Sequence, residues 1–224
     1  MKIYAHRGSS GKNPEMTRQA YLAAIEDGAD GFECDVRLSK DGEIVCIHDA
    51  TTNRISGKKL RVSKTSLREL QGAYEVIVLK ELLDLAIEAR KDLLIETKHP
   101  TVFAGRVERK VVELLDTNSE RISSCAIEVV VMSFSKFALG RVKSKWKVCK
   151  ISKYYLPAIF SNRKIAALSI ELISRRPSLV AKLAKKGSRV LIWTVNKKND
   201  FELCKELKVD GVITNYPNDA RNYG

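Results

Sequence analysis

The sequence predicts an α/β fold, a (β/α)8 TIM barrel with a small insertion at about residues 49–78. Short apolar runs alternate with amphipathic stretches along the chain, which is typical of parallel strands joined by crossover helices. About eight such strand–helix units fit into the chain, the number that closes this barrel. No GxGxxG motif follows the first apolar run, which disfavours the doubly wound open sheet, the structural alternative.

Apolar segments of strand length and composition occur along the whole chain. They cover residues 2–5, 31–38, 43–48, 92–98, 128–133, 147–152, 166–170, 189–194 and 210–214. Amphipathic patterns predict helices near 17–27, 80–90, 102–116, 135–142, 178–186 and 199–207. The polar stretch 49–78 interrupts this alternation and predicts loops and a short helix near one mouth of the barrel. We expect residues 1–224 to form a single domain.

The composition is that of an ordinary globular protein, with 44% hydrophobic and 30% charged residues. No apolar run approaches the roughly 20 residues that span a bilayer, and the N-terminus lacks the features of a signal peptide. Five cysteines form no CxxC pair, which predicts free thiols and argues against a zinc site. A cytoplasmic location is therefore the expectation.

The net charge of +13 is unevenly distributed. Residues 1–100 contain 16 Lys and Arg against 16 Asp and Glu, whereas residues 101–224 contain 24 against 11. Such an excess favours anionic partners such as phosphates, membrane surfaces or nucleic acid. A solvated basic face is the simpler interpretation, because the lysines are dispersed and no nucleic-acid-binding motif accompanies them.

The segment "GFECDV" places two carboxylates on one face of a predicted strand. Side chains alternate along a strand, so Glu33 and Asp35 share one side, and Phe32, Cys34 and Val36 share the other. The apolar residues suit the helix layer, which directs both carboxylates into the barrel. Buried carboxylates repel each other, and a divalent cation relieves that repulsion. Oxygen ligands alone favour Mg²⁺ or Ca²⁺ over Zn²⁺.

The segment "LLIETKHP" repeats the pattern with Glu96 and Lys98. His6 and His48 each end a predicted strand, so a barrel would bring both imidazoles to the same mouth, where they suit acid–base catalysis. Arg7 could donate two hydrogen bonds to a phosphate. The Glu33–Asp35 pair or the Glu96–Lys98 pair alone could be an exposed strand end or an ordinary salt bridge. Together with the two histidines and Arg7, these pairs indicate a metal-assisted phosphoryl-transfer site.

These motifs resemble, in order, the pattern of the glycerophosphodiester phosphodiesterase family. The matching segments are HRG (6–8), PEMT (14–17), FECDV (32–36), SKDG (39–42), HD (48–49), IETK (95–98), MSF (132–134), VLIWTVN (190–196) and VDGVITNYP (209–217). Each fragment is weak alone, whereas the ordered set, from residue 2 to about 217, is highly specific. The sequence departs from the family at Met16, where the family has asparagine, and at Asn215, where it has aspartate.

The resemblance implies metal-dependent hydrolysis of glycerophosphodiesters to sn-glycerol 3-phosphate and an alcohol. It implies attack by the glycerol 2-hydroxyl, giving a cyclic phosphate that water then opens. The implied set is His6 and His48 for catalysis, Glu33, Asp35 and Glu96 for the metal, and Arg7, Lys98, Trp193 and Glu15 for the substrate. A core tryptophan is the alternative for Trp193.

Other functions remain open on the sequence. A phosphodiesterase acting on lysophospholipids or phosphoinositides would share the site, and the basic second half favours weak association with an anionic membrane surface. A non-catalytic phosphodiester-binding module would not require both His6 and His48. Nucleic-acid binding is disfavoured, because no aromatic cluster lies among the lysines.

Overall fold

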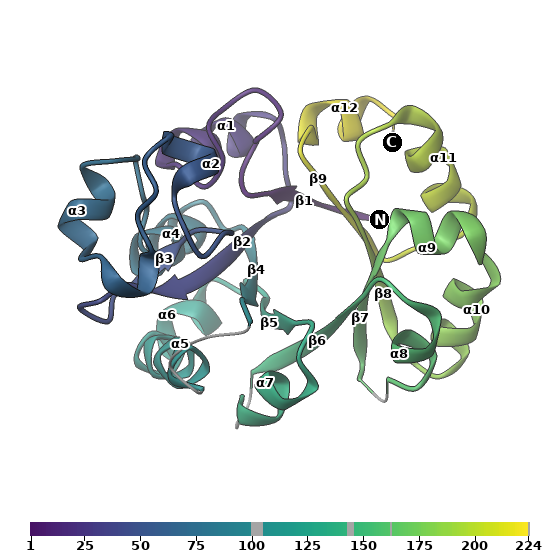
Figure 1. Ribbon diagram of the computed structural model, residues 1–224. Helices are drawn as coiled ribbons and strands as arrows, with labels where there is room; N and C mark the ends of the chain where they lie inside the picture. The colour runs from purple at the N-terminus through teal and green to yellow at the C-terminus, as the bar shows by residue number, and fades with distance from the viewer. Residues whose placement is uncertain (100–104, 143–145, 162, 224) are drawn as a thin grey trace.

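The computed structural model describes residues 1–99, 105–142, 146–161 and 163–223 (Figure 1). Within these ranges eight parallel strands pair in a closed ring, with helices around the outside. The ring closes because β1 (Lys2–His6) pairs with both β2 (Gly31–Leu38) and β9 (Gly211–Thr214). The remaining strands are β4 (Asp92–Thr97), β5 (Val129–Ser133), β6 (Lys147–Ser152), β7 (Ile165–Ser169) and β8 (Arg189–Trp193). The predicted (β/α)8 barrel is confirmed.

The predicted helices form with small differences at their ends. They are α1 (Arg18–Glu26), α4 (Leu79–Glu88), α5 (Arg106–Thr117), α7 (Lys136–Arg141), α10 (Ser178–Lys185) and α11 (Lys198–Glu206). Residues 102–104 of the third predicted helix lie outside the described residues. Four further helices are too short to produce a periodic apolar pattern. They are α6 (Ser119–Ser124), α8 (Tyr155–Ile159), α9 (Ile170–Arg175) and α12 (Pro217–Asn222). In the described ranges, no helix is long and apolar enough to cross a membrane.

The segment predicted as a strand at 43–48 lies outside the barrel. Its strand β3 (Ile44–Cys46) pairs antiparallel with the end of β2, so the chain reverses direction there. The reversal is a tight turn in which Ser39 N–H donates to Glu43 O, and Gly42 adopts a φ of 86° that favours glycine. A short apolar run does not reveal the direction of its strand, so the pattern could not separate β3 from the barrel strands.

The insertion at 49–78 forms α2 (Asn53–Ser56), a 3₁₀ turn (Val62–Lys64) and α3 (Leu67–Gln71). It has an apolar core of its own, separate from the barrel core. That core consists of Val45, Ile47, Val62, Leu70 and Val76, with partly buried neighbours. The insertion therefore folds as a small lobe beside β2 and supplies side chains to one end of the barrel.

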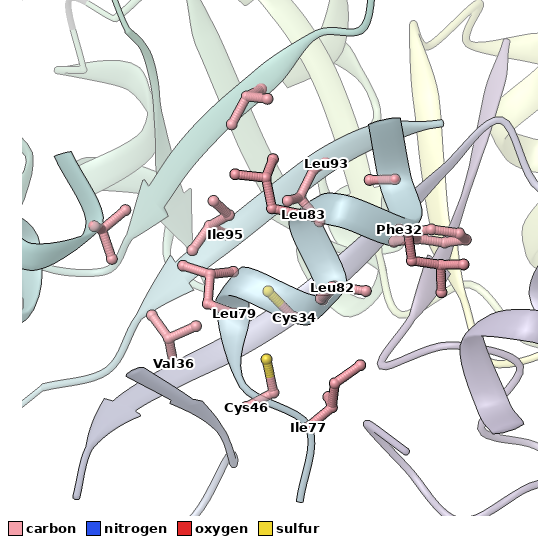
Figure 2. Close-up of a cluster of buried hydrophobic side chains, with 14 of the residues drawn as sticks. Phe32, Cys34, Val36, Cys46, Ile77, Leu79, Leu82, Leu83, Leu93 and Ile95 are labelled. Atoms are coloured by element: carbon pink, nitrogen blue, oxygen red, sulfur yellow. The ribbon is translucent and has the colours of Figure 1, made fainter. Parts of the chain in front are cut away.

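Strand alternation separates two apolar layers. Phe32, Cys34 and Val36 face outward and pack with the buried side of α4, as Figure 2 shows. The opposite faces of the strands fill the barrel with Tyr4, Leu94, Met132, Ile151, Leu191 and Ile213, among others. Burying each large apolar side chain contributes about 1.5–3 kcal/mol. By the same alternation, the inward-facing residues beyond this apolar layer lie at the carboxyl ends of the strands.

Candidate active site

Three buried carboxylates meet at the carboxyl ends of β2 and β4. Glu33, Asp35 and Glu96 each offer one oxygen, and these oxygens all lie within 4.8 Å of one another. The register of the two strands produces the cluster, because Asp35 lies directly beside Glu96. The expected inward orientation of Glu33 and Asp35 is thus confirmed.

Burial and mutual repulsion perturb all three groups. Burial raises the pKa of Glu33 well above its usual value, and the charge of Asp35 adds to the effect. The same two causes raise the pKa of Glu96 to about 7. Burial opposes ionisation of Asp35 too, but the charges of Arg7 and Lys98 outweigh it and lower its pKa to about 2. Without further positive charge, ionisation of Glu33 and Glu96 is therefore disfavoured.

Two basic side chains already partly neutralise the cluster. Lys98 Nζ lies 2.8 Å from Asp35 Oδ1 and 2.7 Å from Glu96 Oε1. Arg7 Nε lies 2.8 Å from Asp35 Oδ2, although the angle is not that of a hydrogen bond. Asp35 Oδ2 is consequently buried without a hydrogen bond among the described residues.

The donor set fits a hard divalent cation. All three ligand candidates are carboxylates, the ligand type that Mg²⁺ and Ca²⁺ prefer. The buried Oδ2 of Asp35 has an unused lone pair, and a cation would favour the ionised forms of Glu33 and Glu96, which burial disfavours. Glu33, Asp35 and Glu96 are therefore the residues that could hold such an ion.

The backbone around Arg7 brings its guanidinium to the carboxylates. Arg7 has a left-handed φ of 59°, a conformation that costs a non-glycine residue roughly 1–2 kcal/mol. Gly8 follows with a φ of 80°, and a Cβ there would lie 2.7 Å from the backbone of Ala20. The glycine of the HRG motif is therefore required by both its conformation and its contact with α1.

His6 lies beside the carboxylate cluster, and the opposite side of its ring is hydrogen-bonded to Asn215. Its Nε2 lies 3.9 Å from Glu33 Oε2, and its Nδ1 lies 2.7 Å from Asn215 Oδ1. An amide oxygen only accepts hydrogen bonds, so Nδ1 carries the proton and Nε2 presents a lone pair toward the carboxylates. Burial, assisted by the Arg7 charge, lowers the pKa of His6 to about 4. The imidazole is therefore neutral at physiological pH.

His48 reaches the same end of the barrel by the β2–β3 hairpin. Its neighbour Ile47 donates a backbone hydrogen bond to Asp35 O at 2.9 Å. Its Nδ1 lies 2.7 Å from Asp49 Oδ1, and burial lowers the pKa of the ring, with Asp35 opposing that effect. The structure thus brings His48 near the carboxylates as expected, but through an antiparallel strand and not a barrel strand.

Glu15 contacts the guanidinium of Arg7. Its carboxylate accepts hydrogen bonds from Arg7 at 3.2 Å and from Arg54 of the insertion at 2.7 Å. These contacts outweigh burial and lower the pKa of Glu15, so it is ionised and orients the Arg7 side chain. Met16, at the family's asparagine position, is buried with a φ of 54°, a conformation that asparagine adopts more readily. The hydrogen bonding around Glu15 is therefore intact despite this departure.

A small pocket lies between the polar residues and an apolar wall. His6, Glu33 and Glu96 line one side, and the wall consists of Met132, Ile151, Ala167, Trp193 and Ile213. Trp193 Nε1 is buried and finds no acceptor among the described residues. The indole therefore presents both an apolar face and an unused donor, which does not match an ordinary core tryptophan.

Three residues that contact the candidate site have no role predicted from the sequence. Asn215 is hydrogen-bonded to His6, and Asp49 is hydrogen-bonded to His48. Arg54 donates hydrogen bonds to both Asp49 and Glu15. Asn215 and Asp49 lie within the family motifs VDGVITNYP and HD, which are the available signal for them. Arg54 lies in a polar stretch without a periodic pattern, and the sequence carries no signal for it.

Divalent cations should stabilise the protein through this cluster. We expect saturating Mg²⁺ or Ca²⁺ to raise the melting temperature, since a ligand at about 100 times its Kd contributes about 2.7 kcal/mol. Glu33→Gln should lose most of this increase, because it removes one ligand charge while leaving the ion pairs of Asp35. The exposed Glu206→Gln is the control and should keep the wild-type response. An equal increase in Glu33→Gln would exclude this cluster as the binding site.

Comparison with known proteins identifies the family. Residues 6–219 match the model of the glycerophosphoryl diester phosphodiesterase family. The chain is 31% identical over 244 residues to the "Probable glycerophosphodiester phosphodiesterase 1" of Mycobacterium tuberculosis, covering 96% of this chain and 89% of that protein. It is 32% identical over 237 residues to a glycerophosphodiester phosphodiesterase of Caldanaerobacter subterraneus, covering 96% and 94% of the two chains.

A solved structure supports the same fold. An Oleispira antarctica phosphodiesterase in complex with the product sn-glycerol-3-phosphate matches with a TM-score of 0.84 at 23% identity, over 100% of this chain and 96% of that one. At this identity the likeness concerns the fold alone. The family match over most of the sequence, together with two relatives above 30% identity, shows that the chain belongs to the glycerophosphoryl diester phosphodiesterase family.

Proposed function

We propose that this protein hydrolyses glycerophosphodiesters to sn-glycerol 3-phosphate and an alcohol, with a divalent cation as cofactor. The observation that carries the proposal is the three-carboxylate cluster flanked by two imidazoles in a member of this family. Pure binding of a phosphodiester would not need an acid–base pair, which disfavours a non-catalytic module. The relatives named glycerophosphodiester phosphodiesterase make the same reaction the first expectation for this chain.

The metal ligands would be Glu33, Asp35 and Glu96. When bound there, Mg²⁺ or Ca²⁺ would act as a Lewis acid toward a phosphate oxygen. The remaining positive charge comes from the chain itself. Arg7 and Lys98, both oriented by carboxylates, donate to the phosphate and offset the charge that develops on its oxygens.

The two histidines divide the proton transfers. Nε2 of His6 accepts the proton of the glycerol 2-hydroxyl, whose oxygen bonds to phosphorus as the P–O bond to the leaving alcohol breaks. His48 donates a proton to that departing oxygen, and its hydrogen bond with Asp49 favours the imidazolium form against burial, which lowers the pKa of the ring. The resulting cyclic phosphate is opened by water, with the two histidines exchanging roles.

The apolar wall would receive the glycerol moiety. The Trp193 ring can pack on its carbons, and the unpaired indole N–H can donate to a glycerol or phosphate oxygen. Glu15 acts on the substrate through Arg7, because an ionised carboxylate would repel a phosphate at direct contact. Five free cysteines, four of them buried, support a location in the reducing cytoplasm.

A second candidate substrate class is a diester that retains an acyl chain, such as a lysophospholipid. Large apolar side chains exposed near the barrel mouth, including Phe137 and Tyr154, favour it. A phosphoinositide would use the same site with a different head group. Weak association with an anionic membrane surface accompanies this candidate.

A product screen tests the proposed function. Purified protein is incubated with glycerophosphocholine, glycerophosphoethanolamine, lysophosphatidylcholine and glycerophosphoinositol, each with EDTA alone or with EDTA followed by excess Mg²⁺ or Ca²⁺. We expect sn-glycerol 3-phosphate from the glycerophosphodiesters only after a cation is restored. Turnover that is insensitive to EDTA would contradict the role of the carboxylate cluster, and turnover of lysophosphatidylcholine alone would select the second candidate.

Removal of either proposed acid–base residue should reduce the chemical step. His6→Ala and His48→Ala should each lower kcat by roughly 10²–10⁴-fold, the usual effect of losing a general acid or base. His99→Gln is the matched control, because His99 contacts Glu108 outside the site and glutamine can still donate to that carboxylate. Wild-type turnover of glycerophosphocholine in either alanine variant would refute the assignment.

Asn215 should control the basicity and orientation of His6. In Asn215→Asp, a negative charge next to Nδ1 favours the imidazolium form and raises the pKa of His6. As the pH is lowered, His6 therefore becomes protonated, and unable to act as a base, at a higher pH than in the wild type. The acidic limb of the kcat/KM profile should therefore move to higher pH, by about one unit or more. Asn222→Asp makes the same change on exposed α12 and should leave the profile unchanged. An unshifted limb in Asn215→Asp would show that the contact does not set the protonation of His6.

A further inference from the structure

Four large apolar side chains are exposed where β5 and β6 end. Phe134 and Phe137 follow β5 with 40% and 69% of their surface exposed, and Tyr154 and Leu156 follow β6 with 73% and 62% exposed. Because β5 and β6 are neighbouring parallel strands, both segments leave the same edge of the barrel (Figure 1). We refer to these four residues, with Lys136 and Lys153, as the β5–β6 rim.

The β5–β6 rim is continuous with the pocket. The Phe134 ring contacts the Trp193 ring edge to face, with centroids 5.6 Å apart. Lys153 Nζ lies 5.4 Å from the centre of the Trp193 ring and 6.0 Å from that of Phe134. An apolar surface therefore extends from the wall of the pocket to the outside of the molecule. Exposed apolar area of this kind, at the entrance to a site, marks an interaction surface.

The stretch of chain that carries the rim is strongly basic. Residues 129–170 contain nine Lys and Arg and no Asp or Glu, although Lys147, Arg163 and Lys164 lie at the edge where the strands begin, and the exposed Glu171 follows β7. Within the rim, Lys136 Nζ lies 5.3 Å from the Phe137 ring centre, so basic and aromatic side chains are interleaved. Aromatic and aliphatic side chains that enter the headgroup region, flanked by lysines, are the combination that binds anionic lipid surfaces.

We propose that the β5–β6 rim docks the barrel mouth on an anionic phospholipid surface. Phe137, Tyr154 and Leu156 enter the headgroup region, and Lys136 and Lys153 contact the lipid phosphates. Docked in this way, the pocket opens toward the membrane, and a diester with an acyl chain reaches the carboxylates from the lipid side. The statement about substrate delivery rests on the proposed function, whereas the docking itself does not.

Vesicle sedimentation of the full chain in EDTA tests the docking without turnover. The vesicles are phosphatidylcholine alone, or phosphatidylcholine with about one third phosphatidylglycerol. We expect the wild type to bind the anionic vesicles at least about tenfold better than the neutral ones. The combined Phe137→Ser, Tyr154→Ser and Leu156→Ser variant should bind the anionic vesicles at least about tenfold more weakly than the wild type.

Phe160→Ser is the matched control for lost apolar surface. Phe160 is 77% exposed but follows the end of α8, where Lys186 at the C-terminus of α10 donates to Ile159 O. That contact places Phe160 toward the edge of the barrel at which the strands begin, away from the β5–β6 rim. The Phe160→Ser variant should therefore bind vesicles like the wild type. Lys136→Glu should weaken binding by about fivefold or more, while Lys185→Glu, on the last residue of α10, should have little effect.

The outcomes separate docking from catalysis. Circular dichroism and hydrolysis of soluble glycerophosphocholine are measured for every variant. Reduced vesicle binding in the rim variants with unchanged soluble turnover supports the proposal. Equal binding of the wild type to both vesicle types, or unchanged binding of both the triple-serine and Lys136→Glu variants, overturns it. Absence of turnover in the wild type would refute the proposed function and leave the vesicle result to decide the docking.

Discussion

Burial of three carboxylates within 4.8 Å of one another is the constraint on which the arrangement of the barrel mouth depends. Such a cluster is unstable without compensating charge, and several separate features of the chain supply or support that charge. Lys98 directly follows β4, two residues after Glu96. Arg7 reaches Asp35 only because the backbone after β1 turns into a left-handed conformation, and Gly8 must follow for that turn to pack on α1.

A second set of charged side chains, Glu15 and Arg54, orients the Arg7 side chain that lies against the carboxylates. Glu15 holds the Arg7 guanidinium, and Arg54 from the insertion holds Glu15. The insertion thus contributes to the site without supplying a metal ligand or a phosphate-binding group. This chain of contacts explains why residues far apart in the sequence, with no apolar periodicity in common, lie together at one end of the barrel.

The barrel is predictable from the alternation of strands with helices, and the carboxylate cluster from the alternation of side chains along each strand. In β2 the apolar residues occupy one face, so the direction of Glu33 and Asp35 could be inferred without coordinates. On β4, Glu96 alternates with the outward-facing Ile95. The contact between His6 and Asn215 joins residues 209 positions apart, and only closure of the ring between β1 and β9 brings them together. The direction of β3 depends on a turn, and Arg54 acts through a contact that no local pattern encodes.

The two histidines lie on parts of the fold with cores of different size. His6 extends a strand of the closed barrel, whereas His48 follows a three-residue strand at the edge of a lobe with a five-residue buried core of its own. Small lobes of this kind open at lower free energy than the domain to which they are attached. Native-state hydrogen exchange would then detect a state in which the lobe is open and the barrel closed. In that state Glu33, Asp35 and Glu96 keep their positions on the barrel strands, whereas Arg54 no longer holds Glu15 and His48 is displaced. The proposed proton donor can therefore be lost before the barrel unfolds.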